Sequence, residues 1–239
     1  SMHKFRYKTF LIFLAALFLA APSSLFAVQN PDPIYGPERA TYGQQIRVQP
    51  NDFDGSFHHE VGIAAPPGRN GIEPGLKLIY SNNQRSDISP YGYGWADNIP
   101  YVERINRKGV NKLYSENFFY SSLDGELKAT STASGFRGYG PLVEGGDFRQ
   151  YVFVGENKWE VTDKRGTKYT FGTSSASQIV NTASSTQVFR WMLEEVRDTN
   201  GNYIEYSYYK HKDNIYPSKI TYTGNGTTEV RITTSGGNT

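Results

Sequence analysis

Cysteine is absent from this sequence of 239 residues, which contains only two methionines. Without cysteine no disulfide can form, so in an oxidising compartment the fold depends on sheet packing or on a larger assembly. A long hydrophobic run is absent too, because the longest one, residues 10–21, falls short of the roughly 20 apolar residues that span a bilayer. A strong excess of basic charge is also missing, since 25 basic residues stand against 23 acidic ones.

The short apolar run belongs to a distinct N-terminal segment. Lys4, Arg6 and Lys8 precede it, and a helix breaker and small residues, Pro22–Ala27, follow it. This order is typical of a secretory signal peptide, so we predict a signal helix in residues 1–27, cleavage after Ala27 and a secreted protein. An uncleaved anchor is the alternative. Cleavage removes three basic residues and leaves 22 against 23 acidic ones, a net charge near −1, which favours neither nucleic acid nor membrane as a partner.

Aromatic residues, glycine and proline are abundant instead. The chain has 18 Tyr and 14 Phe, and 24 Gly and 12 Pro interrupt the aromatic stretches. Tyr, Phe, Thr and Val suit a pleated, half-buried surface. The hydrophobic fraction of 37% fits sheets that have one solvated face. We therefore predict an all-β fold with no helix beyond the signal segment.

Two segments with the same plan lie near the C-terminal end. Asp163-x-x-Gly166 and Asp198-x-x-Gly201 each separate two alternating runs, and the two aspartates are 35 residues apart. Asp accepts backbone N–H groups at the start of a turn, and Gly takes the left-handed position that joins antiparallel strands. Asp124-Gly125 is a third turn of this kind. The pattern predicts antiparallel β-hairpins in series that form an extended, curved sheet.

The rest of the chain divides into two parts that differ in amino-acid composition. Residues 28–55 are rich in Pro and Gln and predict an extended linker, whereas residues 56–239 carry the strand-like runs. Gly172–Thr186, rich in Ser, Thr and Ala, is expected to form a long exposed loop. The sequence stops directly after a hairpin strand, and an unpaired last strand is an aggregation-prone edge. We therefore expect residues 56–239 to be the front part of a longer chain.

Several motifs, in this order, resemble a known family. Pro66–Ser81 is similar to the proline–glycine motif that opens the SpvB-type domain of toxin-complex B components. Further similar segments, in the family's order and spacing, are Tyr91–Trp95, Leu123–Leu127, Trp159–Gly172, Trp191–Tyr208 and Tyr216–Gly224. The resemblance implies the beginning of an Rhs/YD-repeat shell, a long spiralling sheet that encloses a toxic payload polypeptide. It implies as partners the rest of a longer chain or toxin-complex subunits.

Candidate ligand-binding and catalytic groups have local structural explanations. His58-His59-Glu60 is the most metal-like cluster, but neighbouring residues of a strand point to opposite faces, so the three do not converge. Asp163 and Asp198 could act as paired acid and base, yet their turns account for both.

Other polar motifs are equally weak. The glycines of Arg69–Gly71 and Gly92–Gly94 lack the strand–loop–helix context of a phosphate loop. Oxygen-rich groups at Asp124, Asp198–Asn200 and Asp213–Asn214 do not match the spacing of a calcium loop. The sequence thus predicts no catalytic residue, no cofactor and no metal.

The tyrosine-rich run Tyr203–Tyr209 leaves a binding function open. Exposed aromatic rings can stack on sugars, and Tyr206 and Tyr208 are the residues expected to do so. Cross-strand aromatic pairs also stabilise sheets by about 0.2–1 kcal/mol each, and aromatics on both faces of the run favour packing. The prediction is a secreted, non-enzymatic β-scaffold of the Rhs/toxin-B type. A secreted carbohydrate-binding or adhesion module is the alternative.

Overall fold

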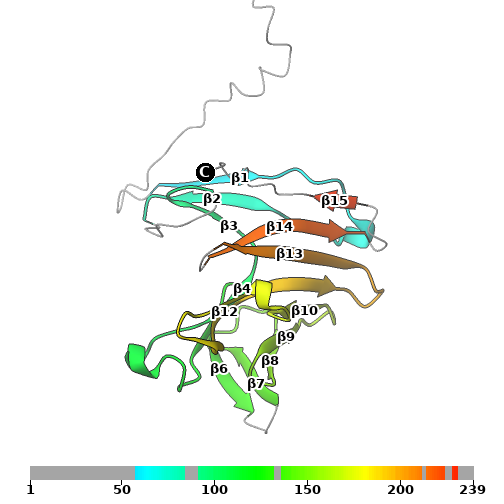
Figure 1. Ribbon diagram of the computed structural model, residues 1–239. Helices are drawn as coiled ribbons and strands as arrows, with labels where there is room; N and C mark the ends of the chain where they lie inside the picture. The colour runs from blue at the N-terminus through cyan, green and yellow to red at the C-terminus, as the bar shows by residue number, and fades with distance from the viewer. Residues whose placement is uncertain (1–56, 84–90, 132–135, 212–213, 224–227, 231–239) are drawn as a thin grey trace, which may run out of the picture. The chain divides into compact units, whose positions relative to one another are not determined.

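The computed structural model describes residues 57–83, 91–131, 136–211, 214–223 and 228–230, all within one compact unit, Val48–Thr239 (Figure 1). The predicted signal helix in residues 1–27 and the predicted linker in residues 28–55 lie outside the described residues.

The described part of the chain folds into strands joined by turns, which confirms the prediction of an all-β fold. Its helical elements are three short 3-10 turns, η1 (Arg69–Gly71), η2 (Val110–Lys112) and η3 (Ser175–Ser177). The strands are β1 (His58–Gly62), β2 (Lys77–Ser81), β3 (Trp95–Asp97), β4 (Tyr101–Arg104), β5 (Phe119–Ser121), β6 (Gly125–Ser131), β7 (Phe136–Pro141), β8 (Gln150–Val154), β9 (Lys158–Thr162), β10 (Lys168–Phe171), β11 (Gln178–Asn181), β12 (Ser184–Arg197), β13 (Tyr203–His211), β14 (Asn214–Tyr222) and β15 (Thr228–Val230).

The strands form two antiparallel sheets. A small sheet has the order β1-β2-β3, and a 12-stranded sheet runs from β10 back through β9 to β4, then to β12 and on to β15. In the large sheet β10 also pairs with β12, so β4 to β10 and β12 close into an eight-stranded barrel. Strands β13, β14 and β15 continue the sheet beyond the barrel, above it in Figure 1.

Closure of the barrel corrects the prediction of a sheet that is extended throughout. The cause is the length of β12, which has 14 residues. Its first part lies between β11 and β4, and its last part lies between β10 and β13. One long strand thus closes the barrel and also starts the extension.

The predicted long exposed loop at Gly172–Thr186 is wrong as well. This stretch contains η3, β11 and the start of β12, and β11 forms a hairpin with β12. Gln178 is buried, and its side-chain amide donates to the carbonyl oxygen of Gly172 at 2.7 Å. A Ser- and Thr-rich composition therefore did not mean solvent exposure here, because backbone pairing and buried hydrogen bonds satisfy the polar groups.

Aromatic rings fill the inside of the barrel. Phe119, Phe153, Trp159 and Trp191 come from four different strands, and each is at most 1% exposed. The ring centroids of Phe153 and Trp159 are 4.5 Å apart, and those of Phe119 and Trp159 are 4.8 Å apart. Such offset and edge-to-face pairs add about 0.5–1.5 kcal/mol each beyond the burial of apolar area. The barrel is thus a packed core rather than a channel.

A buried cation completes this core. Arg104 lies 9% exposed at the end of β4, with its guanidinium 4.9 Å from the centre of the Phe119 ring. It donates to the carbonyl oxygens of Val188 and Glu116 at 3.1 and 3.0 Å. No carboxylate among the described residues forms an ion pair with it, so backbone dipoles and aromatic faces compensate the buried charge.

Asp97, the last residue of β3, lies where the chain passes from the small sheet to the barrel. Its carboxylate accepts hydrogen bonds from the Ile99 N–H at 3.0 Å and from the Tyr91 hydroxyl at 3.1 Å. Burial raises the pKa of Asp97 above its ordinary value, although these two donors and the charge of Arg190 act in the opposite direction.

Within the described residues, no helix is both long and apolar enough to span a membrane.

Replacing Trp159 tests the packed core. Trp159→Ala is expected to lower the free energy of unfolding by about 3–5 kcal/mol, because the cavity left by the indole cannot collapse among fixed rings. Trp159→Phe should cost much less, since the indole N–H it removes is buried without a partner among the described residues. Urea unfolding followed by fluorescence measures both, and equal losses for the two variants would contradict the packing described here.

The raised pKa of Asp97 predicts a pH-dependent effect. A folded carboxyl that holds its proton to higher pH than the unfolded one stabilises the protein at acid pH, and this stability is lost as pH rises above 3.8. Asp97→Asn should therefore unfold at higher urea concentration than the parent at pH 7, and the difference should shrink towards pH 4 or below. Glu205→Gln, an exposed change on β13, is the control. If the urea midpoints of Asp97→Asn and the parent differ by the same amount at every pH, ionisation of Asp97 is excluded as the cause.

Candidate functional site

Two of the turns that the sequence predicts, those at Asp163 and Asp198, meet at one end of the domain. In the β9–β10 turn, the Asp163 carboxylate accepts the N–H groups of Arg165 and Thr167 at 2.8 and 3.0 Å. Gly166 has a φ of +82°, in the left-handed region that favours glycine. The Asp163 carboxylate is therefore used locally, to form the turn.

The β12–β13 turn repeats this arrangement. The Asp198 carboxylate accepts the N–H groups of Asn200 and Asn202 at 2.9 and 2.8 Å, and Gly201 has a φ of +84°. The side-chain amide of Asn202 also donates to Asp198 at 2.7 Å. These donors, Asn202 foremost, hold the pKa of Asp198 below its ordinary value.

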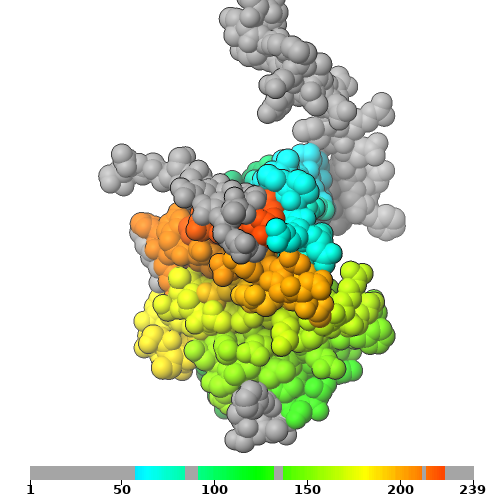
Figure 2. All heavy atoms as spheres, turned by 90° about the vertical axis from the view of Figure 1, so that its right-hand side faces the viewer, coloured from blue at the N-terminus to red at the C-terminus, as the bar shows by residue number. Residues whose placement is uncertain are grey.

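The two turns touch each other and a third segment. A Cβ on Gly166 would lie 2.9 Å from the methyl group of Thr199, so the β9–β10 turn packs against the β12–β13 turn. Asn70 of η1 donates to the Asp198 carboxylate at 3.3 Å, across 128 residues of sequence. Figure 2 looks onto this end, where the cyan, orange and yellow-green segments adjoin. The Pro66–Ser81 motif and both Asp-x-x-Gly turns thus form one structural unit, which we call the three-turn site.

A cleft of about 420 Å³ lies at the three-turn site. Ile72 and Leu123, both half-buried, line it together with buried side chains of β12 and β13, namely Leu193, Val196 and Ile204. Polar groups at the cleft are Glu73, Asn98, Asp163, Arg165, Tyr169 and Tyr206. The sequence contained no signal for this cleft, because its walls come from segments that are far apart in the chain.

The two tyrosines of the cleft differ in their partners. The Tyr169 hydroxyl lies 3.5 Å from the Asp163 carboxylate, and burial followed by the charge of Asp163 raises its pKa. The Tyr206 hydroxyl has no hydrogen-bond partner among the described residues, and burial raises its pKa as well. Both groups remain protonated hydroxyls at neutral pH.

The predicted sugar-stacking pair needs a correction. Tyr208 is only 9% exposed and donates its hydroxyl to the carbonyl oxygen of Leu193, so its ring cannot stack on a ligand. Because Ile204 points into the core, strand alternation turns Tyr206 and Tyr208 inward with it. The outward tyrosines are Tyr209 and Tyr216, which stack with centroids 5.2 Å apart and planes at 16°.

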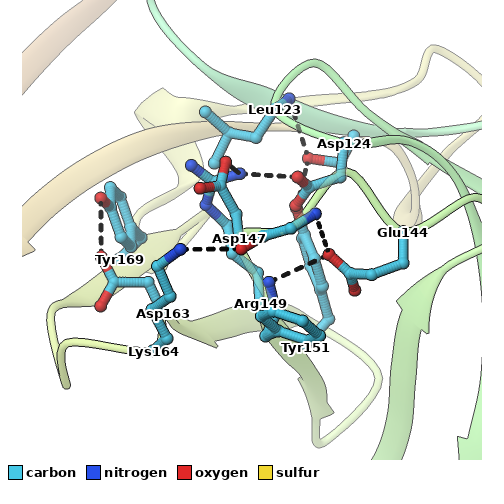
Figure 3. Close-up of polar contacts among 12 residues, drawn as sticks. Leu123, Asp124, Glu144, Asp147, Arg149, Tyr151, Asp163, Lys164 and Tyr169 are labelled. Carbon is cyan, nitrogen blue, oxygen red and sulfur yellow. Dashed lines mark hydrogen bonds and ion pairs between the residues drawn. The ribbon is translucent and has the colours of Figure 1, made fainter.

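The third predicted turn, Asp124-Gly125, lies in a separate polar cluster (Figure 3). Arg149 donates to the Asp124 carboxylate at 2.6 Å, and the Tyr151 hydroxyl donates to its second oxygen. Tyr151 also contacts the hydroxyl of Ser121 at 3.0 Å, and both residues are buried. Burial, then the bond to Asp124, raises the pKa of Tyr151. The cluster fixes the β5–β6 turn to β8, which is a structural use of these groups.

A loop next to this cluster is held in a strained form. Glu144 accepts the N–H groups of Gly146 and Phe148 at 2.8 and 3.0 Å, and Lys164 donates to the Gly146 carbonyl oxygen at 2.8 Å (Figure 3). The two N–H groups hold the pKa of Glu144 below its ordinary value. Phe148 has a φ of +52° and is 61% exposed.

The His58-His59-Glu60 candidate does not form a cluster of metal ligands in the described residues. Glu60 pairs with Lys77 at 3.0 Å, while His59 packs edge-on to Trp95, and the described residues contain no group of three metal-ligating side chains. Asp163 and Asp198 each accept two backbone N–H groups of their own turns.

The glycine-containing candidates lie in turns. Arg69–Gly71 forms η1, and Gly92 and Gly94 lie in a turn before β3 with positive φ. Asp213 lies outside the described residues.

The polar cluster makes a testable contribution to stability. Tyr151→Phe removes the hydroxyl that donates to Asp124 and contacts Ser121, and should lower the free energy of unfolding by about 1–3 kcal/mol. Tyr206→Phe removes a hydroxyl that has no described partner and is the matched control, with little change expected. Equal urea midpoints for Tyr151→Phe and the parent would show that the cluster does not stabilise the fold.

Part of this chain is similar in sequence to known proteins. Proteins named Mono(ADP-ribosyl)transferase SpvB, from Salmonella choleraesuis, Salmonella enteritidis and Salmonella typhimurium, are 23% identical over 171 residues. The match covers 61% of this chain and 28% of those relatives, so the chain spans well under half of their length.

Solved structures share the fold at similar identity. The N-terminal domain of effector protein SpvB from Salmonella typhimurium matches 70% of this chain and 65% of that chain, at 20% identity and a TM-score of 0.56. The Tc holotoxin pore of Photorhabdus luminescens matches 73% of this chain and 10% of that chain, at 23% identity and a TM-score of 0.59. A TcdB2-TccC3 crystal structure matches 73% and 10% of the two chains, at 23% identity and a TM-score of 0.58.

The family described as Salmonella virulence plasmid 65kDa B protein, SpvB, matches residues 51–234. This range contains the barrel, the small sheet and all three turns that the sequence predicted. The predicted resemblance to an SpvB-type domain is thereby confirmed, and the chain belongs to the SpvB family.

Proposed function

We propose that this chain is a secreted, non-catalytic structural segment of a toxin-type protein, which forms part of a β-shell that encapsulates or presents a toxin payload. The observation that carries the proposal is the large sheet, which leaves a solidly packed barrel and continues through β13 and β14 to β15. Such a sheet suits an anchor from which further strands extend. Membership of the SpvB family, and a fold shared with Tc toxin structures, support the same role.

The packed core limits where a payload is held. Phe119, Trp159 and Trp191 occupy the barrel interior, so this barrel encloses no second polypeptide. In our proposal the enclosing wall is the extension that starts at β13, continued by the rest of a longer chain or by toxin-complex subunits. The barrel then acts as a rigid end piece of that wall. The relatives are long enough for this arrangement, since the match covers 28% of their length.

The non-catalytic part of the proposal rests on the state of the polar groups. Asp163 and Asp198 are used by their turns, and Asp124 is used by Arg149 and Tyr151. The activity in the name of the SpvB relatives belongs to those proteins, and we assign none of it to this chain. Secretion through residues 1–27 and removal of that segment remain part of the proposal.

A second candidate function rests on the stacked pair Tyr209 and Tyr216. These residues form an aromatic surface on the outer side of the β13–β14 hairpin, and Tyr209 is 40% exposed. A carbohydrate-binding or adhesion module would use such a surface. Saturable binding on a glycan array that is lost in both Tyr209→Ala and Tyr216→Ala would favour this candidate over the scaffold.

Two measurements test the scaffold proposal. In the gene product that contains this chain, limited proteolysis should leave an enclosed segment protected, and Trp159→Ala should expose that segment to cleavage while the exposed Tyr93→Ala should not. With labelled NAD, the purified chain should transfer no ADP-ribose above background. Equal cleavage of all segments in the parent protein would overturn encapsulation, and transfer that co-purifies with the chain would overturn the non-catalytic assignment.

A further inference from the structure

The cleft at the three-turn site has features that a scaffold does not require. Its wall is apolar, with Ile72 and Leu123 half-buried beside the buried Leu193 and Ile204. Its volume of about 420 Å³ falls in the range of roughly 300–1,000 Å³ that is typical of ligand sites. The cleft can therefore hold one or two apolar side chains of a ligand.

Two carboxylates and one cation line the cleft, and only the cation has no hydrogen-bond partner among the described residues. Both carboxylates there accept backbone N–H groups, Asp163 within its turn and Glu73 from Gly68 at 2.9 Å. Arg165 is exposed, and its guanidinium has no partner among the described residues. A guanidinium binds a carboxylate through charge-assisted hydrogen bonds, often in pairs. Arg165 thus offers an acidic group a charged partner at the rim of the cleft.

The loop of residues 72–76, which forms one wall of the cleft, has backbone N–H groups without acceptors among the described residues. The carbonyl oxygens of Pro74 and Gly75 already accept hydrogen bonds, from the Leu76 N–H at 2.9 Å and from Asn98 at 2.6 Å. The N–H groups of Glu73 and Gly75, in contrast, donate to no acceptor among the described residues. Two such donors, separated by Pro74, fit the carbonyl oxygens of every second residue along an extended polypeptide.

We propose that this cleft binds an extended segment of a partner polypeptide in which an aliphatic or aromatic side chain stands next to an acidic residue. The apolar side chain packs on Ile72 and Leu123, the carboxylate pairs with Arg165, and the partner's carbonyl oxygens accept from Glu73 and Gly75. This binding does not depend on the shell role, because the cleft is complete within the described residues. Failure of encapsulation would leave it unaffected.

Four variants isolate the site. Gly75 lines the cleft, is exposed, has no positive φ, and a Cβ there would meet nothing within 4 Å, so Gly75→Leu fills the cleft mouth without strain. Gly145 has the same properties on the β7–β8 loop, which makes Gly145→Leu the matched control. Arg165→Gln removes the cation of the cleft. Lys128→Gln removes an exposed cation on β6 and is its control.

In the experiment, peptides that bind the immobilised full chain are selected from a displayed library of random decapeptides. Selected peptides should place Leu, Ile, Phe or Tyr beside Asp or Glu. Their affinity should fall about tenfold or more in Arg165→Gln, the size of a charge-assisted hydrogen bond, and binding should be lost in Gly75→Leu. Gly145→Leu and Lys128→Gln should bind like the parent, and all four variants should unfold cooperatively.

Several results would overturn the proposal. Selection that yields no peptide able to distinguish the parent from Gly75→Leu excludes the cleft as a peptide site. Enrichment of basic or purely polar peptides contradicts the assigned chemistry. Octanoate is the competing small carboxylate, and if it alone binds in the cleft with the same dependence on Arg165, the occupant is a small amphiphile and the polypeptide assignment is wrong.

Discussion

The fold depends on one long strand whose two edges pair with four other strands. Because β12 contacts β11 and β10 on one side and β4 and β13 on the other, it joins the closed barrel to the open extension. Trp191 lies in the middle of β12 and contacts both Phe119 and Phe153 of the barrel core. Strand β12 thus determines both the closure of the barrel and the packing of its core. It also holds the start of the open extension against the packed barrel.

Local turn chemistry is the part of the fold that the sequence predicts best. Asp163 with Gly166, and Asp198 with Gly201, indicate hairpins, because the donors that a turn carboxylate accepts lie within four residues of it. The strands themselves are predicted for a similar reason, because the alternation of apolar and polar residues is visible within a few neighbouring positions. The hairpin at Gly172–Thr186 was missed because Ser- and Thr-rich strands lack an apolar face, and their burial is decided by neighbouring strands.

Features that arise from contacts between distant segments could not be predicted in this way. Nothing in the sequence near Asn70 indicates that it binds Asp198, and the cleft beside them exists only once the three turns meet. The tyrosines of β13 show the same limit. Their alternation was visible, but which face is buried follows from the pairing of β13 with β12 and β14, which places Tyr208 inside and Tyr209 outside.

Arg104 has a consequence for how the barrel core responds to pH. A buried carboxylate or histidine changes its charge when a compartment acidifies, and such a group can loosen a core as it titrates. The guanidinium of Arg104 stays charged throughout that range even though burial lowers its pKa, and its partners are carbonyl oxygens and rings that do not titrate there. Mild acidification therefore leaves the charge of this buried group, and its contacts in the barrel core, unchanged.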